Sequence, residues 1–347
     1  MTRAPSQSGF SLIELLIATG LILIIASTVT GALLQMTKHQ QTVWNRTEMN
    51  SGIRGATELM QQEVGQAGRI ALGGAPTLAA AVTAAASCDP TAPATNAVTV
   101  AVNSTVTGVS AVSGMFATAG PPAAYEMLTT LDGDNQESFR LSSFATSPAT
   151  ITACFTKSHA VGTVLAPLGG FATGIVPPSG LANGSDGYHL KMYGDINSDG
   201  QMVYVEYLCD NGDLLGPSAS HNLYRNVMAY DAASKPPTAS SQILLGNIQS
   251  NPPPSGSTTP VPCFTYQTST ISVSTTPFTF VLDVAITLTV QTEQVDQVTK
   301  AYQTETKALL NVSPRNVFNT WEYAGMGYTE RIQSTPLSIT ALLPPVP

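Results

Sequence analysis

Residues 195–206, DINSDGQMVYVE, place oxygen-bearing side chains at the spacing of a calcium-binding loop. Oxygens at alternate positions converge on one point, and Gly200 permits the sharp turn. The strand-like residues that follow, MVYVEYL, can point the last acid away from the ion, so an ordinary hairpin turn is the alternative. The candidate calcium ligands are Asp195, Asn197, Asp199, Gln201 and Glu206.

Other residues of catalytic types are scattered along the sequence. No His-Glu-x-x-His metal motif, Gly-x-Ser-x-Gly nucleophile turn or Gly-x-x-x-x-Gly-Lys phosphate loop occurs. The four histidines are isolated from one another: His39, His159, His189 and His221. The sequence therefore predicts a protein that is not an enzyme.

The cysteines indicate disulfides. Four of them lie far apart, without the Cys-x-x-Cys spacing of metal and redox sites. An even number in an exported chain predicts two bridges, for which four cysteines allow three pairings. We favour Cys88–Cys154 and Cys209–Cys263, because each joins a strand-like segment to a loop-rich one nearby in sequence.

The composition gives no sign of nucleic acid as a partner, although a local basic groove would escape a count over the whole sequence. The 14 Lys and Arg residues are spread over all 347 positions and form no basic stripe, so the sequence carries no electrostatic footprint for nucleic acid. Only 10% of residues are charged, and Thr, Ser, Ala and Gly are abundant. This composition is typical of a secreted or surface-exposed protein rich in β-structure.

One carboxylate interrupts the long apolar run near the N-terminus. Residues 10–34 carry a single charge, Glu14, and as a helix they measure about 37 Å, more than the ~30 Å hydrocarbon core of a bilayer. No small-residue cleavage site follows the run, which favours a membrane-spanning helix over a removable secretion signal. A carboxylate inside a membrane costs roughly 2.5–3.5 kcal/mol, so Glu14 is expected to have a function.

The helix is expected to continue beyond the membrane as an amphipathic segment, residues 35–68. Its apolar residues recur every three or four positions, which predicts one helical face, and the glycines predict fraying near Gly68. This stripe packs on the protein's own globular part, on neighbouring subunits, or on both along different lengths. It consists of Met49, Ile53, Ala56, Met60, Val64 and Ala67.

Gly9-Phe10, followed by Ser-Leu-Ile-Glu14 and the apolar helix, resembles the prepilin signature of type IV pilins and of the pseudopilins of type II secretion. The resemblance covers about the first 35 residues. It implies that a membrane-embedded prepilin peptidase removes residues 1–9 and methylates the new N-terminal residue, Phe10. It also implies a single pass through the inner membrane, with Arg3 holding the leader in the cytoplasm and the following domain in the periplasm.

The same resemblance implies a function for the buried acid. In a helical filament, Glu14 of one subunit reaches the Phe10 amine of its neighbour, and the pairing offsets the desolvation of both charges. The implied partners are the prepilin peptidase, other minor and major pilins, and the inner-membrane assembly platform. Gly31 stands where many family members carry a helix-breaking proline, which predicts local melting of the helix in a filament.

The remainder of the chain has the pattern of β-structure. SFRLSSF and ATITACFTK alternate like strands, FTFVLDVAITLTVQTEQ is the strongest strand signal, and VTKAYQTETKALLNV is its expected partner. The first part of residues 73–120 is expected to be loop-like and the Pro-rich tail to be peripheral. We predict an α+β pilin-like fold, in which the long membrane-spanning helix packs on a mainly antiparallel β-sheet domain. The predicted segments are the leader peptide (1–9), the membrane-spanning half of the helix (10–34), its amphipathic half (35–68), the β-rich periplasmic domain (69–333) and the Pro-rich tail (334–347).

A looser resemblance lies within the β region. HLKMYGDINSDGQMVYVEYLCDNGDLL, NLYRNV, VAITLTVQT and VSPRNV resemble the larger minor pilins of the PilW type, with their Asp/Asn/Gly turn, tyrosine strand, Leu-x-Arg element and closing strand that ends in Arg-Asn. This implies a minor pilin that initiates or assembles a type IV pilus. A J-type pseudopilin of type II secretion shares the helix and much of the sheet, and the Thr/Ser-rich insertions also suit a pilus-tip adhesin. Neighbouring genes would separate pilus from secretion system.

Overall fold

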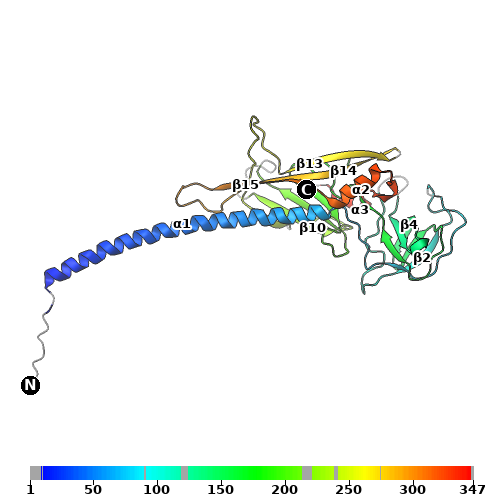
Figure 1. Cartoon of the computed structure of the whole chain (residues 1–347), viewed down its shortest axis with the longest axis horizontal. Helices are drawn as coiled ribbons and strands as arrows, with labels where there is room; N and C mark the ends of the chain where they lie inside the picture. The colour runs from blue at the N-terminus through cyan, green and yellow to red at the C-terminus, as the bar shows by residue number, and fades with distance from the viewer. Residues whose placement is uncertain are drawn as a thin grey trace, which may run out of the picture. The chain divides into compact units, whose positions relative to one another are not determined.

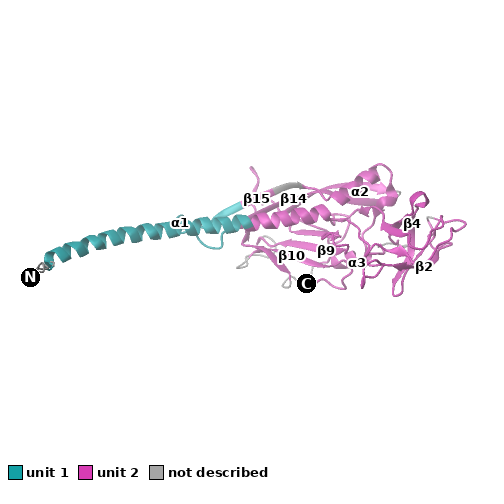
Figure 2. Ribbon diagram, turned by 60° about the horizontal axis from the view of Figure 1, so that its bottom comes forward, with its two compact units in different colours: residues 1–51, 291–305 teal, residues 52–290, 306–347 magenta. Residues whose placement is uncertain are grey.

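The computed structural model describes residues 9, 11–89, 91–118, 124–212, 221–237, 241–273 and 275–344. One long helix, α1 (Leu12–Gln66), is followed by β-strands and then by short C-terminal helices (Figure 1). Nearly all strand pairs are antiparallel, which confirms the predicted α+β pilin-like class. The chain divides into two compact units, residues 1–51 with 291–305 and residues 52–290 with 306–347 (Figure 2).

In the first unit, the loop that precedes β15 (Thr304–Val312) is attached to α1 by polar side chains. Gln41 Nε2 donates to Gln294 Oε1 at 2.8 Å, and Arg46 Nε donates to Gln303 Oε1. The helix is unbroken through this region and also through Gly31, the weak point at which the sequence predicted local melting in a filament.

Helix α1 ends near Gly68, as its glycines predicted. Gly68 has φ +81°, and a Cβ at this position would lie 2.8 Å from Val317 Cγ2, so the chain needs a residue without a side chain to turn here. Asn316 Nδ2 donates to the carbonyl oxygens of Gln66 (3.1 Å) and Ala67 (3.3 Å). These bonds satisfy carbonyls that the last helical turn leaves without partners.

The amphipathic stripe is buried within the protein's own fold. Each of its six residues is at most 8% exposed, which confirms that this face packs on the chain's own globular part. The buried residues are Met49, Ile53, Ala56, Met60, Val64 and Ala67.

The first sheet has the strand order β11-β10-β9-β8. Three of its tyrosines, Tyr193, Tyr204 and Tyr207, are fully buried. Its strands are β8 (His189–Gly194), β9 (Val203–Cys209), β10 (Asn222–Ala229) and β11 (Gln242–Gly246).

The second sheet is built around β14 (Thr276–Gln291), the strand with the strongest sequence signal. It pairs with β13 (Phe264–Val273) along ten registered positions and with the short β12 (Ile248–Gln249). β15 also pairs with β14, which confirms the partner predicted from the sequence.

A closed barrel precedes these sheets, in a region where the sequence indicated partly loop-like structure. The barrel closes because β1 pairs with both β2 and β6, and its own apolar core fills the interior. Its strands are β1 (Thr77–Leu78), β2 (Val98–Asn103), β3 (Met127–Leu131), β4 (Ser138–Thr146), β5 (Ala149–Ala153) and β6 (Val164–Pro167).

The two ends of the barrel segment lie together, since Thr77 pairs with Val164. The barrel therefore has the connectivity of an insertion into the rest of the unit. One of its connections packs outside it: Phe116 belongs to the neighbouring core and lies 5.0 Å from the ring of Phe171, and Tyr230 Oη donates to the Met115 carbonyl at 2.7 Å.

The C-terminal segment is part of the core, so the expectation of a peripheral tail was wrong. Helix α3 (Leu337–Leu342) buries Ile339 and Leu342, because these apolar residues share one helical face. The buried Lys191 Nζ donates to the Leu343 carbonyl at 2.9 Å, which ties the end of this helix to β8.

A short pair of parallel strands connects the barrel to the C-terminal region. β7 (Gly170–Phe171) pairs in parallel with β16 (Ile332–Gln333).

The remaining elements are short helices. Helix α2 (Arg315–Gly325) begins directly after Pro314, so the Arg315-Asn316 dipeptide starts a helix and does not end a strand. Turn η1 (Gly133–Asn135) joins β3 to β4, and η3 (Thr329–Arg331) precedes β16.

Two disulfides join the pairs that the sequence favoured. Cys88–Cys154 links the segment before β2 to the residue after β5, and Cys209–Cys263 links the end of β9 to the residue before β13. The second bridge therefore connects the two sheets. Each is expected to stabilise the fold by roughly 2–4 kcal/mol, because it restricts the unfolded chain.

A buried ion pair attaches α1 to the first sheet. Glu63, only 5% exposed, binds Arg225 of β10, whose Nε lies 3.1 Å from Oε1 and 3.3 Å from Oε2. Tyr207 of β9 donates its hydroxyl to Glu63 Oε2. Burial, and the adjacent Glu63 carboxylate, raise the pKa of Tyr207, so the tyrosine remains a donor at physiological pH.

A second buried acid, Glu126, lacks such hydrogen-bonding partners in the described residues. Glu126 is fully buried beside the barrel, and within the described part of the chain neither carboxylate oxygen has a hydrogen-bond partner. Burial raises the pKa of Glu126 well above its ordinary value, because a charged carboxylate there would lose its hydration without compensation.

We expect Arg225→Ala to lower the free energy of unfolding by about 3–5 kcal/mol, because it leaves the Glu63 charge buried and unpaired. The double variant Glu63→Leu/Arg225→Met should lose much less, since it removes both charges. Denaturant unfolding of the purified variants measures both values. A loss in the double variant equal to that of Arg225→Ala would contradict this account.

We also expect Glu126→Gln to change the pH profile of stability. The folded chain holds the Glu126 proton to higher pH than the unfolded chain, so wild type loses stability as pH rises above the unfolded pKa of about 4.3. Gln has no proton to lose. The two proteins should have the same free energy of unfolding near pH 4. Above pH 4 the variant should become more stable than wild type by up to ~1.4 kcal/mol per pH unit, until the pKa of Glu126 in the folded protein is reached. Parallel melting curves across this range would exclude a buried, protonated Glu126.

Candidate functional site

The candidate site is the start of α1, where Ser11 and Glu14 form a helix cap. Ser11 Oγ accepts the backbone N–H of Glu14 at 3.2 Å, and the Ser11 carbonyl accepts the N–H groups of Glu14 and Leu15, both at 3.1 Å. Ser at the N-cap with Glu three residues later is the capping-box pattern, which fixes where the helix begins. Glu14 therefore lies in the first turn, where the helix dipole favours a negative charge.

The expected cleavage site directly precedes this cap. Gly9 is exposed, and a Cβ at this position would meet no atom within 4 Å. Phe10, the expected new N-terminal residue, lies outside the described residues, as do residues 1–8. The helix begins at Leu12, so an amine on Phe10 would lie two residues before the first helical turn.

The first part of α1 has the surface of a membrane-spanning helix. Its large apolar side chains are 52–81% exposed between Leu12 and Leu34. By length and composition, α1 is the one helix in the described residues that can cross a membrane. Polar side chains within the run are satisfied internally: Thr19, Ser27 and Thr28 donate to carbonyls one turn earlier at 2.8–3.0 Å, as hydrocarbon surroundings require.

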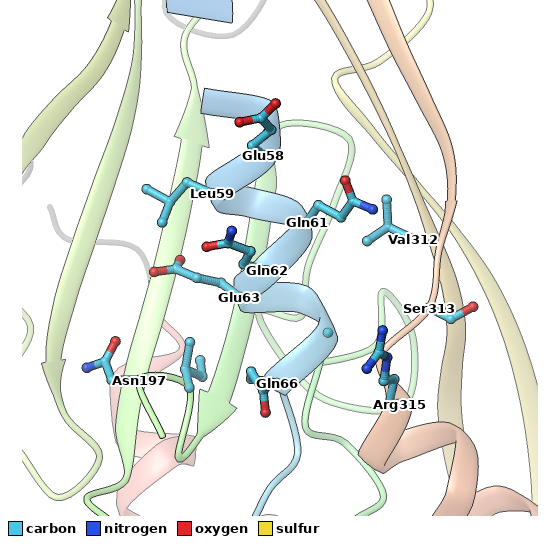
Figure 3. A pocket seen from close by; sticks show the side chains of 12 residues that line it. Glu58, Leu59, Gln61, Gln62, Glu63, Gln66, Asn197, Val312, Ser313 and Arg315 are labelled. Atoms are coloured by element: carbon cyan, nitrogen blue, oxygen red, sulfur yellow. The ribbon is translucent and has the colours of Figure 1, made fainter. Parts of the chain in front are cut away.

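The second part of α1 leaves a polar face open opposite the buried stripe. A hollow of about 860 Å³ lies along this face in the second unit (Figure 3). Glu58, Gln61, Gln62 and Gln66 line it from the helix, Asn197 from one side, and Val312, Ser313 and Arg315 from the other.

The predicted calcium ligands are divided between a turn and a strand. Asp195 is 1% exposed, and its Oδ1 accepts the N–H groups of Asp199 (3.0 Å) and Gly200 (3.3 Å), while Oδ2 lies 3.5 Å from Arg69 Nε. Asp199 Oδ1 accepts the Gln201 N–H at 2.9 Å. These bonds are those of an Asp/Asn/Gly turn.

The last candidate ligand lies on β9, away from that turn. Glu206 Oε2 accepts the Tyr204 hydroxyl at 3.0 Å and pairs with Lys235 Nζ. Burial and the Glu206 carboxylate raise the pKa of Tyr204. Within the described residues, no group of three or more His, Cys, Asp or Glu is placed to hold a metal ion. The hairpin alternative therefore accounts for these side chains, and the structure gives the calcium hypothesis no support.

Sequence reasoning missed the partners of the isolated histidines. His159 is buried, with Nδ1 2.9 Å from Asp132 Oδ2 and Nε2 2.7 Å from Glu137 Oε1. These acids flank the turn between β3 and β4. The imidazole therefore links that turn to the segment that follows β5. His189 similarly lies 2.9 Å from Asp186 Oδ2. The acids of the first group lie over 20 residues from His159 in sequence, so local spacing carries no signal for them.

The structural importance of Glu63 was also not predicted, although its position in the sequence carried one signal. It is adjacent to Val64 and lies three and four residues from Met60 and Ala67, all on the buried stripe. An acid at the edge of an apolar stripe is expected to have a partner in the fold, and only the tertiary structure supplies its identity, Arg225.

Comparison with known proteins agrees with the geometry of the helix start. Residues 5–30 match the prokaryotic N-terminal methylation motif. No curated protein and no solved structure matches the chain.

The motif supports the type IV prepilin and pseudopilin class, whose members serve in pilus or secretion-system assembly. It implies processing by a prepilin peptidase and association with other pilins and the assembly machinery, and it points to a structural rather than a catalytic protein. With the apolar part of α1, the motif indicates a membrane-anchored protein.

We expect the mature chain to begin at N-methyl-Phe10, and Gly9→Leu to block this processing, because the peptidase must admit a residue without a side chain before the cut. Mass spectrometry of the membrane-extracted protein measures both. Cleavage of the Leu variant at the wild-type rate, or an intact Met1 terminus in cells with active peptidase, would contradict the assignment.

Proposed function

We propose that the chain is a minor pilin of the PilW type, which is cleaved after Gly9, methylated on Phe10 and takes part in starting and assembling a type IV pilus. The observation that carries this proposal is Glu14, a single carboxylate in the first turn of an exposed apolar helix.

Glu14 is without a cation in the chain as the structure describes it. It makes no ion pair with a described residue, and its backbone N–H donates to Ser11. In a filament, the Phe10 amine of an axially displaced neighbour is a cation at the matching depth of the apolar layer. Because each charge is unfavourable there alone, pairing selects the register in which the two meet.

Two of the elements on which the PilW-type resemblance rests contact α1, although the second of them starts helix α2 and does not end a strand. The arginine of the Leu-x-Arg element, Arg225, binds Glu63 of α1. The asparagine of the second Arg-Asn element, Asn316, satisfies the last carbonyls of α1. Both elements therefore fasten the assembly helix to its domain, which is a requirement of a pilin subunit.

The open face of α1 suits contact with neighbouring subunits. Gly55 and Gly65 have no atom within 4 Å of a Cβ built on them, so another backbone could approach closely. Arg54 and Glu58 form an exposed pair at 2.7 Å on the same stretch. Packing of this face in the fibre, together with burial of the opposite stripe in the domain, would use both faces of one helix.

We further propose that the leader is cytoplasmic and the domain periplasmic, before the subunit enters the fibre. Arg3 and the apolar run favour this orientation by the positive-inside rule. The two disulfides suit an oxidising compartment.

A J-type pseudopilin is the alternative, since the helix and its processing would be the same. Deletion of the gene separates the two: loss of surface pili with normal protein secretion supports the minor pilin, and loss of secretion with normal pili supports the pseudopilin. Neighbouring genes for other minor pilins, or for a secretin and a secretion ATPase, provide an independent criterion.

We expect Glu14→Ala to leave membrane insertion and cleavage intact but to reduce incorporation into sheared fibres severalfold, because the neighbour's amine loses its partner. Thr19→Val is the matched control, since it removes a polar group of the same helix that bonds only to Leu16 of its own chain. Immunoblots of sheared fibres and of membranes give the ratio. Equal recovery of the Ala variant and wild type would refute the register function.

A further inference from the structure

A cleft of about 830 Å³ lies in the second unit between the barrel and the C-terminal region. β4 supplies Ser138, Phe139 and Arg140 on one side, next to the Cys88–Cys154 disulfide. The β13–β14 hairpin, η3 and β16 supply the other side. The volume is within the ~300–1,000 Å³ range of small-molecule sites.

The barrel side of this cleft holds a cation without a counter-ion. Arg140 Nη1 donates to the Tyr125 carbonyl at 2.8 Å, and this is the one hydrogen bond of the guanidinium within the described part of the chain. Of its five N–H donors, four are left over. No described carboxylate lies within 4.0 Å of the group, and burial lowers the pKa of Arg140. Partly buried charges are ordinarily paired, so this guanidinium is available to an anion.

The acids of the cleft limit what that anion can be. Asp89, Glu137 and Glu330 also line it. Glu137 is occupied, since it accepts the N–H groups of Thr156 (2.8 Å) and Lys157 (3.1 Å). Three carboxylates around one cation disfavour a dianion such as phosphate. They favour a ligand with one negative charge and several hydroxyl groups, because carboxylates accept hydrogen bonds from hydroxyls.

The other residues that line the cleft also suit a ligand with several hydroxyl groups. Glu330 is exposed to the cleft and has no hydrogen-bond partner within the described residues. The partly buried ring of Phe278 provides apolar surface for the C–H face of a sugar ring, whereas the ring of Phe139 is buried in the barrel core. Side-chain hydroxyls come from Ser138, Thr156, Thr276, Thr329 and Ser334.

We propose that this cleft binds an acidic saccharide, whose carboxylate is held by Arg140 and whose hydroxyls are bound by Glu330 and the serine and threonine side chains. The site is distinct from the assembly helix, so it does not depend on the proposed pilus function. It would make the barrel a recognition module carried by the subunit.

Titration calorimetry of the full chain in detergent tests this with galacturonate as the probe, because this sugar carries one carboxylate and several hydroxyl groups. Wild type should bind galacturonate and bind its methyl ester about tenfold or more weakly, because a hydrogen-bonded ion pair is lost. Arg140→Gln should bind acid and ester equally weakly. Arg54→Gln is the matched control on α1 and should bind as wild type does, and so should Glu14→Ala, which separates this test from that of the fibre.

A second variant covers the case in which Arg140→Gln fails to fold. Glu330→Gln keeps the guanidinium, so it should retain the preference for acid over ester while binding both more weakly. The proposal is overturned if wild type does not bind galacturonate, if acid and ester bind equally, or if folded Arg140→Gln binds as wild type does. Tighter binding of inorganic phosphate than of galacturonate would also overturn it.

Discussion

The pairing of Glu63 with Arg225 and Tyr207 is the interaction on which the attachment of α1 depends. Apolar contacts along the stripe are not directional, whereas a buried carboxylate is satisfied only where its partners lie. Asn316 and Gly68 then fix the end of the helix. The three contacts determine which turn of α1 lies on β9 and β10.

Two of the acids of α1, Glu14 and Glu63, provide a useful contrast. Glu63 is buried and finds its cation and its hydroxyl donor in its own chain. Glu14 lies in an exposed apolar segment and is bonded only through its backbone. Since hydrocarbon penalises an unpaired carboxylate, we propose that Glu14 finds its cation on a neighbouring subunit of the class that the N-terminal methylation motif supports.

The barrel adds a second hydrophobic core to the fold. Its two ends meet at Thr77 and Val164, so a subunit could acquire it without disturbing the helix and sheets. The contact of Phe116 with Phe171 and the buried Glu126 lie where the barrel meets the neighbouring core. Segments with few charges and many small residues can form such a barrel because strand pairing satisfies their backbone and their apolar residues fill its interior.

The sequence by itself determined the elements whose signal is local: the Ser11–Glu14 helix start, the apolar run, the buried stripe, the strongest strand and its partner, and the favoured cysteine pairs. Only the tertiary structure decided the rest. The barrel is closed by pairs such as Thr77 with Val164, and the cluster at His159 is assembled from distant turns. Glu206 belongs to a strand rather than to the preceding turn because Tyr204 and Lys235 hold it there. In each case the deciding contacts join residues far apart in sequence or depend on which side of a strand faces the core, and spacing along the chain carries neither kind of information.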